Sequence, residues 1–499
     1  MFAQTRASER FRLTKNLNKL LEGISYQVRG ALPESITTLA LNSGKVESGG
    51  LFVAIRGAKE DGHHHINDAI RRGASAIVVE EFQPKVNMPQ ILVSDTKIAL
   101  SKIANAFFDS PSNKMKVVGV TGTNGKTTTV FLLNHIFKQA GFKRGTIGTL
   151  GYTIEDESFA SNLTTPDSLQ LQSILLQMAE KGVTHVAMEV SSHSLALHRV
   201  DDIHYHAGVF TNISQDHLDF HHTIESYAKT KTELFRQVEP NGFLVCNADD
   251  FYSELFHQAA KARVYDFSLQ HKMDFSFRKG VTFTQGIDGI IDTPNVSIPI
   301  RCPLSGEFNL KNILGATAVS SLLRISSSDI SEALSQIAYV PGRLQEVSKP
   351  GFPRTFVDYA HTPDALINVL TALRKITPPD GKLIAVFGCG GNRDRQKRPL
   401  MAKAVESLAD YAILTTDNPR FENPEAIIAE ASIGFSSSKK YQTIPDRKIA
   451  IQTAIGNANE NDIIAVLGKG HETYQEIKGV RYPFYDVDVI RKFFNGQRD

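Results

Sequence analysis

A glycine-rich run, TGTNGKTT, occupies residues 121–128 and directly follows an apolar run, VVGV. Glycines let backbone N–H groups curl around phosphate oxygens, the ammonium of Lys126 adds a positive charge, and the hydroxyl of Thr127 can bind magnesium. Val120 stands where the strict phosphate-loop pattern has its first glycine. A glycine turn with an incidental lysine would not explain why an apolar strand, a loop and a helix-like segment follow in this order. We therefore expect this run to bind nucleotide phosphates.

Polar side chains also follow two other apolar runs in the middle of the chain. HVAMEVSSHSLALHRV (185–200) carries Glu189 at the end of such a run, and NISQDHLDFHHTIESYAKTKTELF (212–235) supplies His217 and Lys231 among further acids and bases. A carboxylate in this position can hold the Mg²⁺ that bridges phosphates. Any single histidine here could be a packing or surface residue, but the set indicates a second face for metal or substrate.

The segment TTDNPRFENPE (415–425) allows two interpretations. In the first, Asp417 and Asn418 before Pro419 form a turn, and Arg420 is simply solvated. In the second, a rigid turn presents the N–H donors of the guanidinium to a carboxylate. Spacing alone favours the turn, so the choice depends on the rest of the chain.

The elements that must position these residues alternate between apolar strands and helical stretches. We expect strands near 115–120, 184–190, 206–213, 242–249, 355–360, 382–390, 410–417 and 462–470, and a helix near 124–141. This alternation predicts an α/β fold with parallel sheets, whose ligands bind beyond the carboxyl ends of the strands. Turn-rich joints at 109–114 and 339–345 predict three domains, at 1–110, 111–340 and 341–499.

Composition limits the classes of function. A chain of 499 residues is long enough for about three domains. Its 55 Lys and Arg against 53 Asp and Glu give a charge of +2, which predicts no attraction to nucleic acid or anionic lipid. Cys246, Cys302 and Cys389 are too widely spaced for a disulfide framework or a thiolate zinc site. With no signal-like N-terminus and no long apolar run, we expect a cytoplasmic monomer that binds no membrane.

Further motifs follow in order along nearly the whole chain: SGEFNLKNILGA (305–316), YVPGRLQ (339–345), VDYAHTPDAL (357–366), FGCGGNRDRQKRP (387–399) and LGKGHETYQ (467–475). Together with TGTNGKTT, MEVSSH, NISQDHLDFH, YAKTKTELF and DNPR, they resemble the Mur ligases, ATP-dependent amide-bond synthetases of peptidoglycan assembly. The resemblance implies a UDP-muramoyl-substrate-binding α/β domain, a central ATP-binding P-loop domain and a C-terminal, Rossmann-like amino-acid-binding domain. It also implies ATP and Mg²⁺ as ligands.

The resemblance further implies a reaction. The γ-carboxylate of UDP-N-acetylmuramoyl-L-alanyl-D-glutamate would attack ATP to give an acyl phosphate, and the amine of meso-diaminopimelate would displace phosphate. The implied catalytic residues are Lys126, Glu189, His217 and Lys231, of which the last three and Thr127 would surround magnesium, with Lys231 carbamylated by CO₂. The implied ATP contacts are Gly122, Thr123, Asn124, Gly125, Lys126, Thr127, Thr128, Asn309, Arg343, Asp358 and His361.

Two substrate sites follow from the same resemblance. The implied UDP-muramoyl-dipeptide contacts are Leu41, Ser43, Ala58, Lys59, Glu60, Thr164, Thr165, Ser191 and Arg199. The family's usual Asp-Ser-Arg is here Asn42, Ser43 and Gly44, and Leu197 stands where a glutamine is often found. The implied diaminopimelate contacts are Arg393, Asp417, Asn418, Pro419, Arg420, Gly468 and Glu472. DNPR marks diaminopimelate-adding members, so Arg420 is expected to bind a carboxylate and the turn to be its scaffold.

Three alternatives remain distinguishable. A sibling ligase that adds lysine, or glutamate to folate, would share the central motifs but not DNPR and the UDP-binding block. A nucleotide switch would hydrolyse ATP without any amino acid, and a nucleic-acid motor would need a basic surplus. The triplet at residues 63–65, all histidines, could suggest a metal site, but adjacent histidines in a polar turn rarely converge on one ion.

Overall fold

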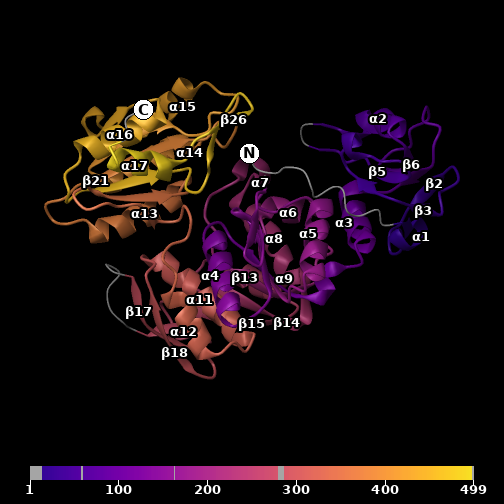
Figure 1. Cartoon of the computed structure of the whole chain (residues 1–499), viewed down its shortest axis with the longest axis horizontal. Helices are drawn as coiled ribbons and strands as arrows, with labels where there is room; N and C mark the ends of the chain where they lie inside the picture. The colour runs from indigo at the N-terminus through magenta and orange to yellow at the C-terminus, as the bar shows by residue number, and fades with distance from the viewer. Residues whose placement is uncertain (1–13, 58–59, 162, 279–285, 497–499) are drawn as a thin grey trace.

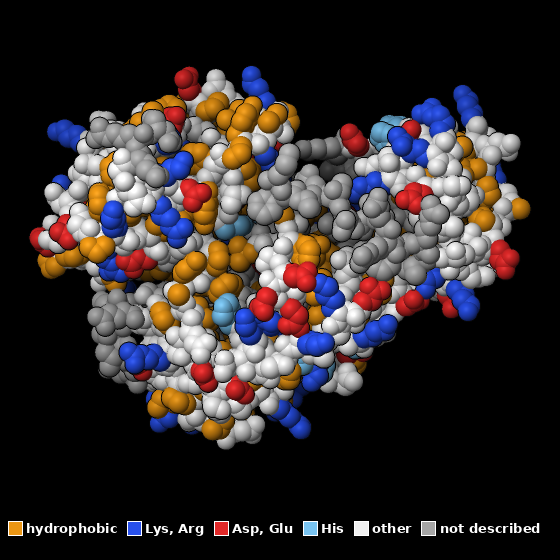
Figure 2. All heavy atoms as spheres, in the orientation of Figure 1, with side chains coloured by type: hydrophobic (Ala, Val, Ile, Leu, Met, Phe, Trp, Pro, Cys, Tyr) orange, Lys and Arg blue, Asp and Glu red, His pale blue; other side chains and the backbone are white. Residues whose placement is uncertain are grey.

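The computed structural model describes residues 14–57, 60–161, 163–278 and 286–496, which form three lobes in chain order. In Figure 1 the N-terminal lobe (indigo) and the C-terminal lobe (orange to yellow) lie on opposite sides, and the central lobe lies between and below them. Figure 2 shows that acidic and basic side chains are interspersed over this face. This mixture agrees with the near-neutral charge of the chain.

The N-terminal lobe contains a sheet of strand order β2-β7-β6-β5-β4, in which β4 to β7 are parallel and β2 is antiparallel. Its inner strands are short, buried apolar runs such as GLFV and AIVV, as a sheet covered on both faces requires. The elements are β1 (Lys15–Asn16), α1 (Leu17–Leu20), β2 (Gln27–Arg29), β3 (Ser35–Ile36), β4 (Leu39–Ala40), η1 (Ser43–Lys45), β5 (Gly50–Val53), η2 (Gly62–His65), α2 (Ile66–Arg71), β6 (Ala74–Val79), β7 (Gln90–Leu92) and α3 (Thr96–Phe107).

The central lobe is built on a sheet of order β11-β10-β9-β12-β8-β13-β14-β15-β16-β17-β18. The strands from β9 to β16 in this order are parallel, whereas β10, β11, β17 and β18 extend the edges in antiparallel hairpins. Its strands are β8 (Lys116–Thr121), β9 (Arg144–Gly148), β10 (Gly151–Ile154), β11 (Glu157–Phe159), β12 (His185–Glu189), β13 (Tyr205–Phe210), β14 (Val238–Asn247), β15 (Arg263–Ser268), β16 (Phe275–Arg278), β17 (Ile287–Asp292) and β18 (Ser297–Cys302).

Helices of the central lobe cover both faces of this sheet with separate apolar clusters. They are η3 (Pro111–Lys114), α4 (Lys126–Gln139), α5 (Ser168–Glu180), α6 (Ser192–Ala196), α7 (Leu218–His221), α8 (Ile224–Lys231), α9 (Glu233–Gln237), α10 (Ser253–Ala259), α11 (Glu307–Leu322) and α12 (Ser327–Ser335). The helix α4 buries Leu132, Leu133 and Ile136, which are spaced for one apolar face. This packing fixes the start of α4 at the phosphate loop.

The C-terminal lobe has a sheet of order β19-β20-β24-β21-β22-β23, parallel from β20 to β23 with β19 antiparallel at one edge. Its elements are β19 (Gln345–Glu346), β20 (Arg354–Asp358), α13 (Pro363–Ile376), β21 (Leu383–Cys389), α14 (Lys397–Leu408), β22 (Tyr411–Thr416), α15 (Pro424–Ser432), η4 (Ser438–Lys440), β23 (Tyr441–Thr443), α16 (Arg447–Asn457), β24 (Ile463–Leu467), β25 (Tyr474–Ile477), β26 (Val480–Pro483) and α17 (Asp486–Phe494).

The predicted α/β architecture with parallel sheets is confirmed, and every strand expected from the sequence is present. Most strand ends agree within two residues, but β13 and β24 each end three residues earlier than expected and β14 begins four residues earlier. The antiparallel edges of the central sheet were not expected, because β10, β11, β17 and β18 carry no nucleotide-like motif that would mark them. Among the described residues, no helix is both long and apolar enough to cross a membrane.

Candidate active site

The phosphate loop between β8 and α4 encloses the side chain of Lys126. Lys126 Nζ donates hydrogen bonds to the carbonyls of Gly122 at 2.8 Å and Thr123 at 2.7 Å, and burial lowers the pKa of Lys126. Gly122 has a φ of 145°, and a Cβ there would lie 2.0 Å from Thr211 Oγ1. Glycine is therefore required for the chain to pass this point. The loop has the strand–turn–helix context that the sequence predicted.

Glu189, at the end of β12, lies directly beside the first turn of α4. Its carboxylate accepts hydrogen bonds from Thr127 Oγ1 at 3.1 Å, Thr149 N at 2.7 Å and Thr149 Oγ1 at 3.0 Å, and the residue is only 1% exposed. A buried carboxylate next to a phosphate-loop hydroxyl is a donor set suited to Mg²⁺. Thr127 and Glu189, both expected around magnesium, are therefore adjacent in the structure.

Lys231 reaches the phosphate loop from α8. The residue is 1% exposed, and its Nζ donates to the carbonyl of Gly122 at 2.8 Å and lies 4.6 Å from the ring centroid of Tyr227. Burial, with the charge of nearby Lys126, lowers the pKa of Lys231 well below its usual value. A neutral amine is nucleophilic, so this site fits the chemistry of carbamate formation.

His217 directly precedes α7 in a left-handed conformation, with a φ of 54°. Its Nε2 lies 3.4 Å from Asp216 Oδ2, and burial lowers the pKa of His217 to about 3. A neutral imidazole is the form that binds a metal. Lys397 Nζ, from the C-terminal lobe, lies 3.7 Å from Asp216 Oδ1. Sequence reasoning did not select Lys397, although it belongs to the basic run 393–398.

A reaction cavity of about 240 Å³ brings the phosphate loop and the DNPR turn together. The predicted residues that line it are Thr123, Asn124, Gly125, Lys126, Thr127, Thr164, Glu189, Ser191, His217, Lys231, Arg343, His361, Arg393, Asp417, Asn418, Arg420, Gly468 and Glu472. Most of these residues follow β8, β12 and β13 of one sheet and β20, β21, β22 and β24 of another, whereas Thr164 follows β11, Lys231 ends α8 and Arg343 precedes β19. The carboxyl ends of strands in two lobes thus share one site, as expected for parallel α/β sheets.

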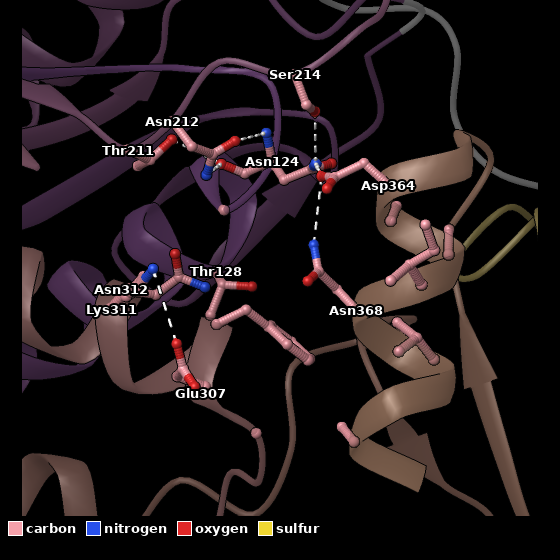
Figure 3. A pocket seen from close by; sticks show the side chains of 18 of the residues that line it. Asn124, Thr128, Thr211, Asn212, Ser214, Glu307, Lys311, Asn312, Asp364 and Asn368 are labelled. Carbon is pink, nitrogen blue, oxygen red and sulfur yellow. Dashed lines mark hydrogen bonds and ion pairs between the residues drawn. The ribbon is translucent and has the colours of Figure 1, made fainter. Parts of the chain in front are cut away.

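A second cavity, of about 510 Å³, opens from the phosphate loop between α11 and α13, and Figure 3 shows these helices on its two sides. We call it the nucleotide cavity. Asn124 Nδ2 crosses between the lobes to Asp364 Oδ2 at 2.9 Å. The predicted residues Thr128, Arg343, Asp358 and His361 also line it.

Asn309 lies elsewhere than the resemblance implied. It is buried, its amide donates to the carbonyl of Ser305 at 2.7 Å, and it does not line the nucleotide cavity. Asn312, one turn later on α11, does line it, and its Nδ2 lies 3.5 Å from Asn309 Oδ1. In this structure Asn309 supports a neighbour that faces the nucleotide cavity.

The turn expected at the DNPR segment is present, but Arg420 is not simply solvated. The residue has a φ of 52°, its backbone N–H donates to Glu476 O at 3.0 Å, and its Nη1 donates to Gly391 O at 2.7 Å. The Nε lies 3.7 Å from a carboxylate oxygen of Glu476. A turn therefore holds the guanidinium against β25 while the side chain lines the reaction cavity. Pro419 shapes this turn and does not line the cavity.

A resident cation, Lys469, lies beneath the acidic side of the same cavity. Its Nζ contacts Asn418 Oδ1 at 3.1 Å and Glu472 Oε2 at 3.0 Å, and Asn418 Nδ2 donates to the same oxygen of Glu472 at 2.7 Å. Burial raises the pKa of Glu472, an effect that Lys469 opposes. Asp417 Oδ2 is buried without a hydrogen-bond partner among the described residues, which leaves it available to a cation. Sequence reasoning missed Lys469.

The predicted dipeptide contacts lie around the end of β12. Thr165 Oγ1 donates to the carbonyl of Glu189 at 2.8 Å, and Arg199 Nη1 donates to the carbonyl of Thr165 at 3.3 Å. Thr164 and Ser191 line the reaction cavity, whereas Thr165 and Arg199 do not. The latter pair instead makes hydrogen bonds to backbone carbonyls of this segment.

The predicted uridine contacts lie in the N-terminal lobe. Asn42 accepts a hydrogen bond from Gly44 N at 2.8 Å and so caps the short helix that begins at Ser43. Leu41 precedes this cap and is partly buried, and Glu60 is exposed. Ala58 and Lys59 lie outside the described residues. Asparagine therefore fills the capping role that the family's aspartate could fill.

The histidine triplet does not form a metal site. His63 Nδ1 lies 2.7 Å from Asp61 Oδ1, and its Nε2 accepts from the backbone N–H of Glu80 at 3.1 Å, so both ring nitrogens are engaged. His64 and His65 are exposed. The expectation against a shared metal ion agrees with this geometry.

The spacing of the cysteines did not predict a cluster of possible metal ligands around Cys246. Cys246, His257 and Asp266 bring one ligand atom each within 4.8 Å of one another. His257 Nε2 is already 2.9 Å from Asp266 Oδ1, and burial raises the pKa of the Cys246 thiol well above its usual value. The thiol of Cys246 is therefore protonated, and the pair formed by His257 and Asp266 is partly exposed.

Family models match three segments of the chain between residues 35 and 470. Residues 35–108 match "Mur ligase family, catalytic domain", residues 120–320 match "Mur ligase middle domain", and residues 342–470 match "Mur ligase, glutamate ligase domain". These three matches correspond in order to the three lobes.

Curated relatives and solved structures agree with these matches. The chain is 42% identical over 484 residues, 96% of its length and 100% of the relative, to a UDP-N-acetylmuramoyl-L-alanyl-D-glutamate–2,6-diaminopimelate ligase of Bacteroides thetaiotaomicron. It is 43% identical over 458 residues, 92% of the chain and 93% of the relative, to the ligase of the same name from Aquifex aeolicus. A solved structure titled with that name is 31% identical, covers 97% of this chain and 99% of its own, and gives a TM-score of 0.68. A MurF ligase from Thermotoga maritima in complex with ADP, 21% identical over 92% of this chain and 97% of its own with a TM-score of 0.62, shares the fold. The chain belongs to the Mur ligase family.

Proposed function

We propose that this protein is the ATP-dependent ligase that joins meso-diaminopimelate to the D-glutamate γ-carboxylate of UDP-N-acetylmuramoyl-L-alanyl-D-glutamate in peptidoglycan precursor synthesis. The observation that carries this proposal is the single reaction cavity lined by the phosphate loop, Glu189, Lys231 and the DNPR turn. The names of relatives about 40% identical over nearly the full chain support the same substrates.

In this proposal the chain's main task is to align three charged reactants. ATP lies with its base in the nucleotide cavity and its phosphates along residues 122–128. The substrate carboxylate attacks the γ-phosphorus, ADP leaves, and the amine then attacks the acyl phosphate carbon and expels phosphate. Alignment and neutralisation of charge supply the rate enhancement, because the reaction needs no nucleophile from the protein.

Magnesium fits the residues present. Thr127, Glu189 and His217 offer a hydroxyl, a carboxylate and a neutral imidazole around one cavity. When bound at these residues, Mg²⁺ would neutralise negative charge on the phosphates. The amine of Lys231 would add to CO₂ and release a proton, which would give a carbamate anion on the same side of the cavity.

Selection of diaminopimelate rests on charge. The distal carboxylate of the substrate would pair with Arg420 and its ammonium with Glu472 and Asp417, whose Oδ2 has no partner among the described residues. Arg393, Asn418 and Gly468 line the same wall. Lysine lacks the distal carboxylate and would leave Arg420 without its partner, which opposes the sibling ligase that adds lysine.

The remaining proposals concern the domain boundaries, the uridine site, and the oligomeric state and location of the protein. We divide the chain at residues 110 and 340, because each main sheet and each family match falls inside one of the resulting ranges. The N-terminal lobe, through Leu41, Ser43 and the segment 58–60, would hold the uridine nucleotide. We also propose a cytoplasmic monomer that acts on small molecules. The balanced charge supports the absence of nucleic-acid and anionic-membrane partners.

Phosphate release tests the proposed reaction. The purified protein receives ATP, Mg²⁺ and UDP-N-acetylmuramoyl-L-alanyl-D-glutamate, with meso-diaminopimelate, with L-lysine or with neither. Release together with a tripeptide product only with diaminopimelate is the expected result. Equal use of lysine would contradict the selectivity, and release without any amino acid or muramoyl substrate would indicate a nucleotide switch.

A further inference from the structure

A third cavity, of about 530 Å³, lies on the other side of the wall formed by Thr127 and Glu189. We call it the rear cavity. These two residues line both the rear cavity and the reaction cavity. Its remaining walls are α4, β9, β10 and parts of the C-terminal lobe at Pro341, His471 and Tyr485. Apart from Thr127 and Glu189, none of the residues assigned above to a substrate lines it.

The basic side chains of the rear cavity are already paired. Arg144 Nη1 contacts Glu155 at 2.9 Å and Arg144 Nη2 contacts Asp156 at 2.6 Å, while Lys138 Nζ contacts Asp156 at 3.0 Å. An anionic ligand would have to displace these carboxylates. The charge pattern therefore favours a neutral ligand over phosphate or a carboxylic acid.

Three polar atoms of the rear cavity are buried without a hydrogen-bond partner among the described residues: Asn134 Oδ1, Arg144 Nε and His471 Nδ1. The ring of His471 lies against the backbone of Thr149, which favours a ring N–H directed at that backbone, and burial lowers the pKa of His471 to about 3. Because a neutral imidazole that donates from one nitrogen accepts at the other, His471 Nδ1 is an acceptor. The residues that line the rear cavity thus carry two unpartnered acceptors and one unpartnered donor.

Aromatic side chains form part of the same wall. The rings of Phe131 and His135 lie 4.3 Å apart, centroid to centroid, and Tyr485 faces the rear cavity from the C-terminal lobe. Flat ligands gain contact area against such walls. A primary carboxamide carries two N–H donors and one carbonyl acceptor, the complement of the three unpartnered atoms.

We propose that the rear cavity is a second small-molecule site, which binds a neutral aromatic carboxamide through Asn134, Arg144 and His471. Its occupant would touch the central and C-terminal lobes at once. Thr149, bonded to both Glu189 and His471, connects the rear cavity to the reaction cavity. A bound carboxamide would therefore restrain the relative motion of the lobes and slow turnover without occupying a substrate position. This kinetic consequence rests on the proposed function, whereas the binding does not.

Nicotinamide and benzamide are the probes for a binding test, with the full chain and saturation-transfer NMR at millimolar probe concentration. Asn134→Leu removes one acceptor, and Ser158→Trp narrows the rear cavity from an exposed strand position. Neither residue belongs to the proposed catalytic or substrate sites. Asn113→Leu, at an exposed asparagine outside all three cavities, is the matched control.

We expect both probes to bind in the presence of saturating ADP, and both rear-cavity variants to weaken binding about tenfold, the value of one hydrogen bond. The control should bind as the parent does. Displacement of the probes by ADP, equal binding by all variants, or no binding to the parent would each overturn the proposal. With binding established, the probes should lower kcat without raising the KM for ATP. Binding without this inhibition would overturn the coupling alone.

Discussion

Arg343 Nη2 donates a hydrogen bond to Thr127 Oγ1 at 2.9 Å, although the two residues are 216 positions apart. Arg343 lies in the joint between the central and C-terminal lobes, with its guanidinium 4.8 Å from the ring centroid of Tyr359. Gly342 beside it has a φ of 64°, and a Cβ there would lie 2.1 Å from the backbone N of His471. The phosphate loop therefore acquires a guanidinium only when the lobes are packed in this arrangement.

Replacement of Arg343 should weaken the use of ATP. We expect Arg343→Ala to lower kcat/KM for ATP about 100-fold, because a preorganised donor beside the transferred phosphate is lost. Arg343→Lys should restore part of the loss, since charge returns without the bidentate fork. Steady-state phosphate release measures both variants. Arg354→Ala, which breaks a half-exposed pair with Glu346, is the control, and a similar loss there would contradict a specific role.

Replacement of Arg420 should weaken the use of meso-diaminopimelate and leave the use of ATP nearly unchanged. Arg420→Ala should lower kcat/KM for meso-diaminopimelate about 10²–10³-fold, because the proposed partner of the distal carboxylate is removed. The KM for ATP should change less than about threefold, since Arg420 does not line the nucleotide cavity. Initial rates with each substrate varied in turn provide the measurement. Equal losses for both substrates would count against carboxylate recognition by this residue.

The proposed carbamate on Lys231 can be detected by ¹³C NMR of its carbonyl carbon. With ¹³C-labelled bicarbonate, we expect one carbamate resonance in the parent protein and none in Lys231→Met. Removal of CO₂ should lower turnover reversibly, because the site would lose an anion. The buried amine beside Lys126 is the physical reason that Lys231, and not Lys229, should react. A labelled resonance that persists in Lys231→Met would place the modification elsewhere.

The sequence predicted the parts of the site that lie next to one another along the chain. Thr127 and Lys126 follow a strand and a glycine loop, so their roles could be assigned from order and spacing. Lys397 and the contact of Lys469 with Asn418 could not be assigned in this way, because Asp216 and Asn418 lie more than 50 positions from these lysines. Lys469 also contacts Glu472, three residues away, but spacing alone does not show that its side chain turns towards the site. Only the packing of one lobe against another, or of one strand end against the next, brings such pairs together.

Asn309 illustrates a second limit of prediction from sequence, which concerns residues close together in the chain. The motif SGEFNLKNILGA contains two asparagines one turn apart on α11, and sequence spacing cannot decide which one faces a ligand. The structure buries Asn309 and exposes Asn312 to the nucleotide cavity, because the rotation of α11 is set by its apolar contacts with the central sheet. Prediction of the fold was more complete, since its strands are continuous apolar runs.

Lys469 should control the ionisation of Glu472. Burial raises the pKa of Glu472 and Lys469 opposes this rise, so Lys469→Met should raise that pKa further. A carboxyl group is ionised above its pKa, and binding of the substrate ammonium requires the ionised form. The acid limb of kcat/KM for diaminopimelate should therefore shift to higher pH in Lys469→Met and return towards the parent in Lys469→Arg. An unchanged pH profile with a uniform loss of activity would indicate a purely structural lysine.

The stability of the C-terminal lobe should depend on a fully buried ion pair. Arg447 contacts Asp486 through two hydrogen bonds, at 2.8 and 2.7 Å, and also donates to the carbonyl of Leu467, just before the loop of Gly468. Arg447→Met leaves Asp486 buried and unpaired, which should cost about 3–5 kcal/mol of local stability.

The double variant Arg447→Met/Asp486→Leu should recover most of this loss, because apolar replacement of a buried pair is often neutral. Hydrogen exchange of α16 and α17, compared with that of α4, measures the change within one lobe. Arg374→Ala, which breaks a partly exposed pair with Asp410, should change the free energy of opening measured by hydrogen exchange by less than about 1 kcal/mol. If the double variant were as unstable as the single one, the loss would come from packing, and the unpaired carboxylate would not be its cause.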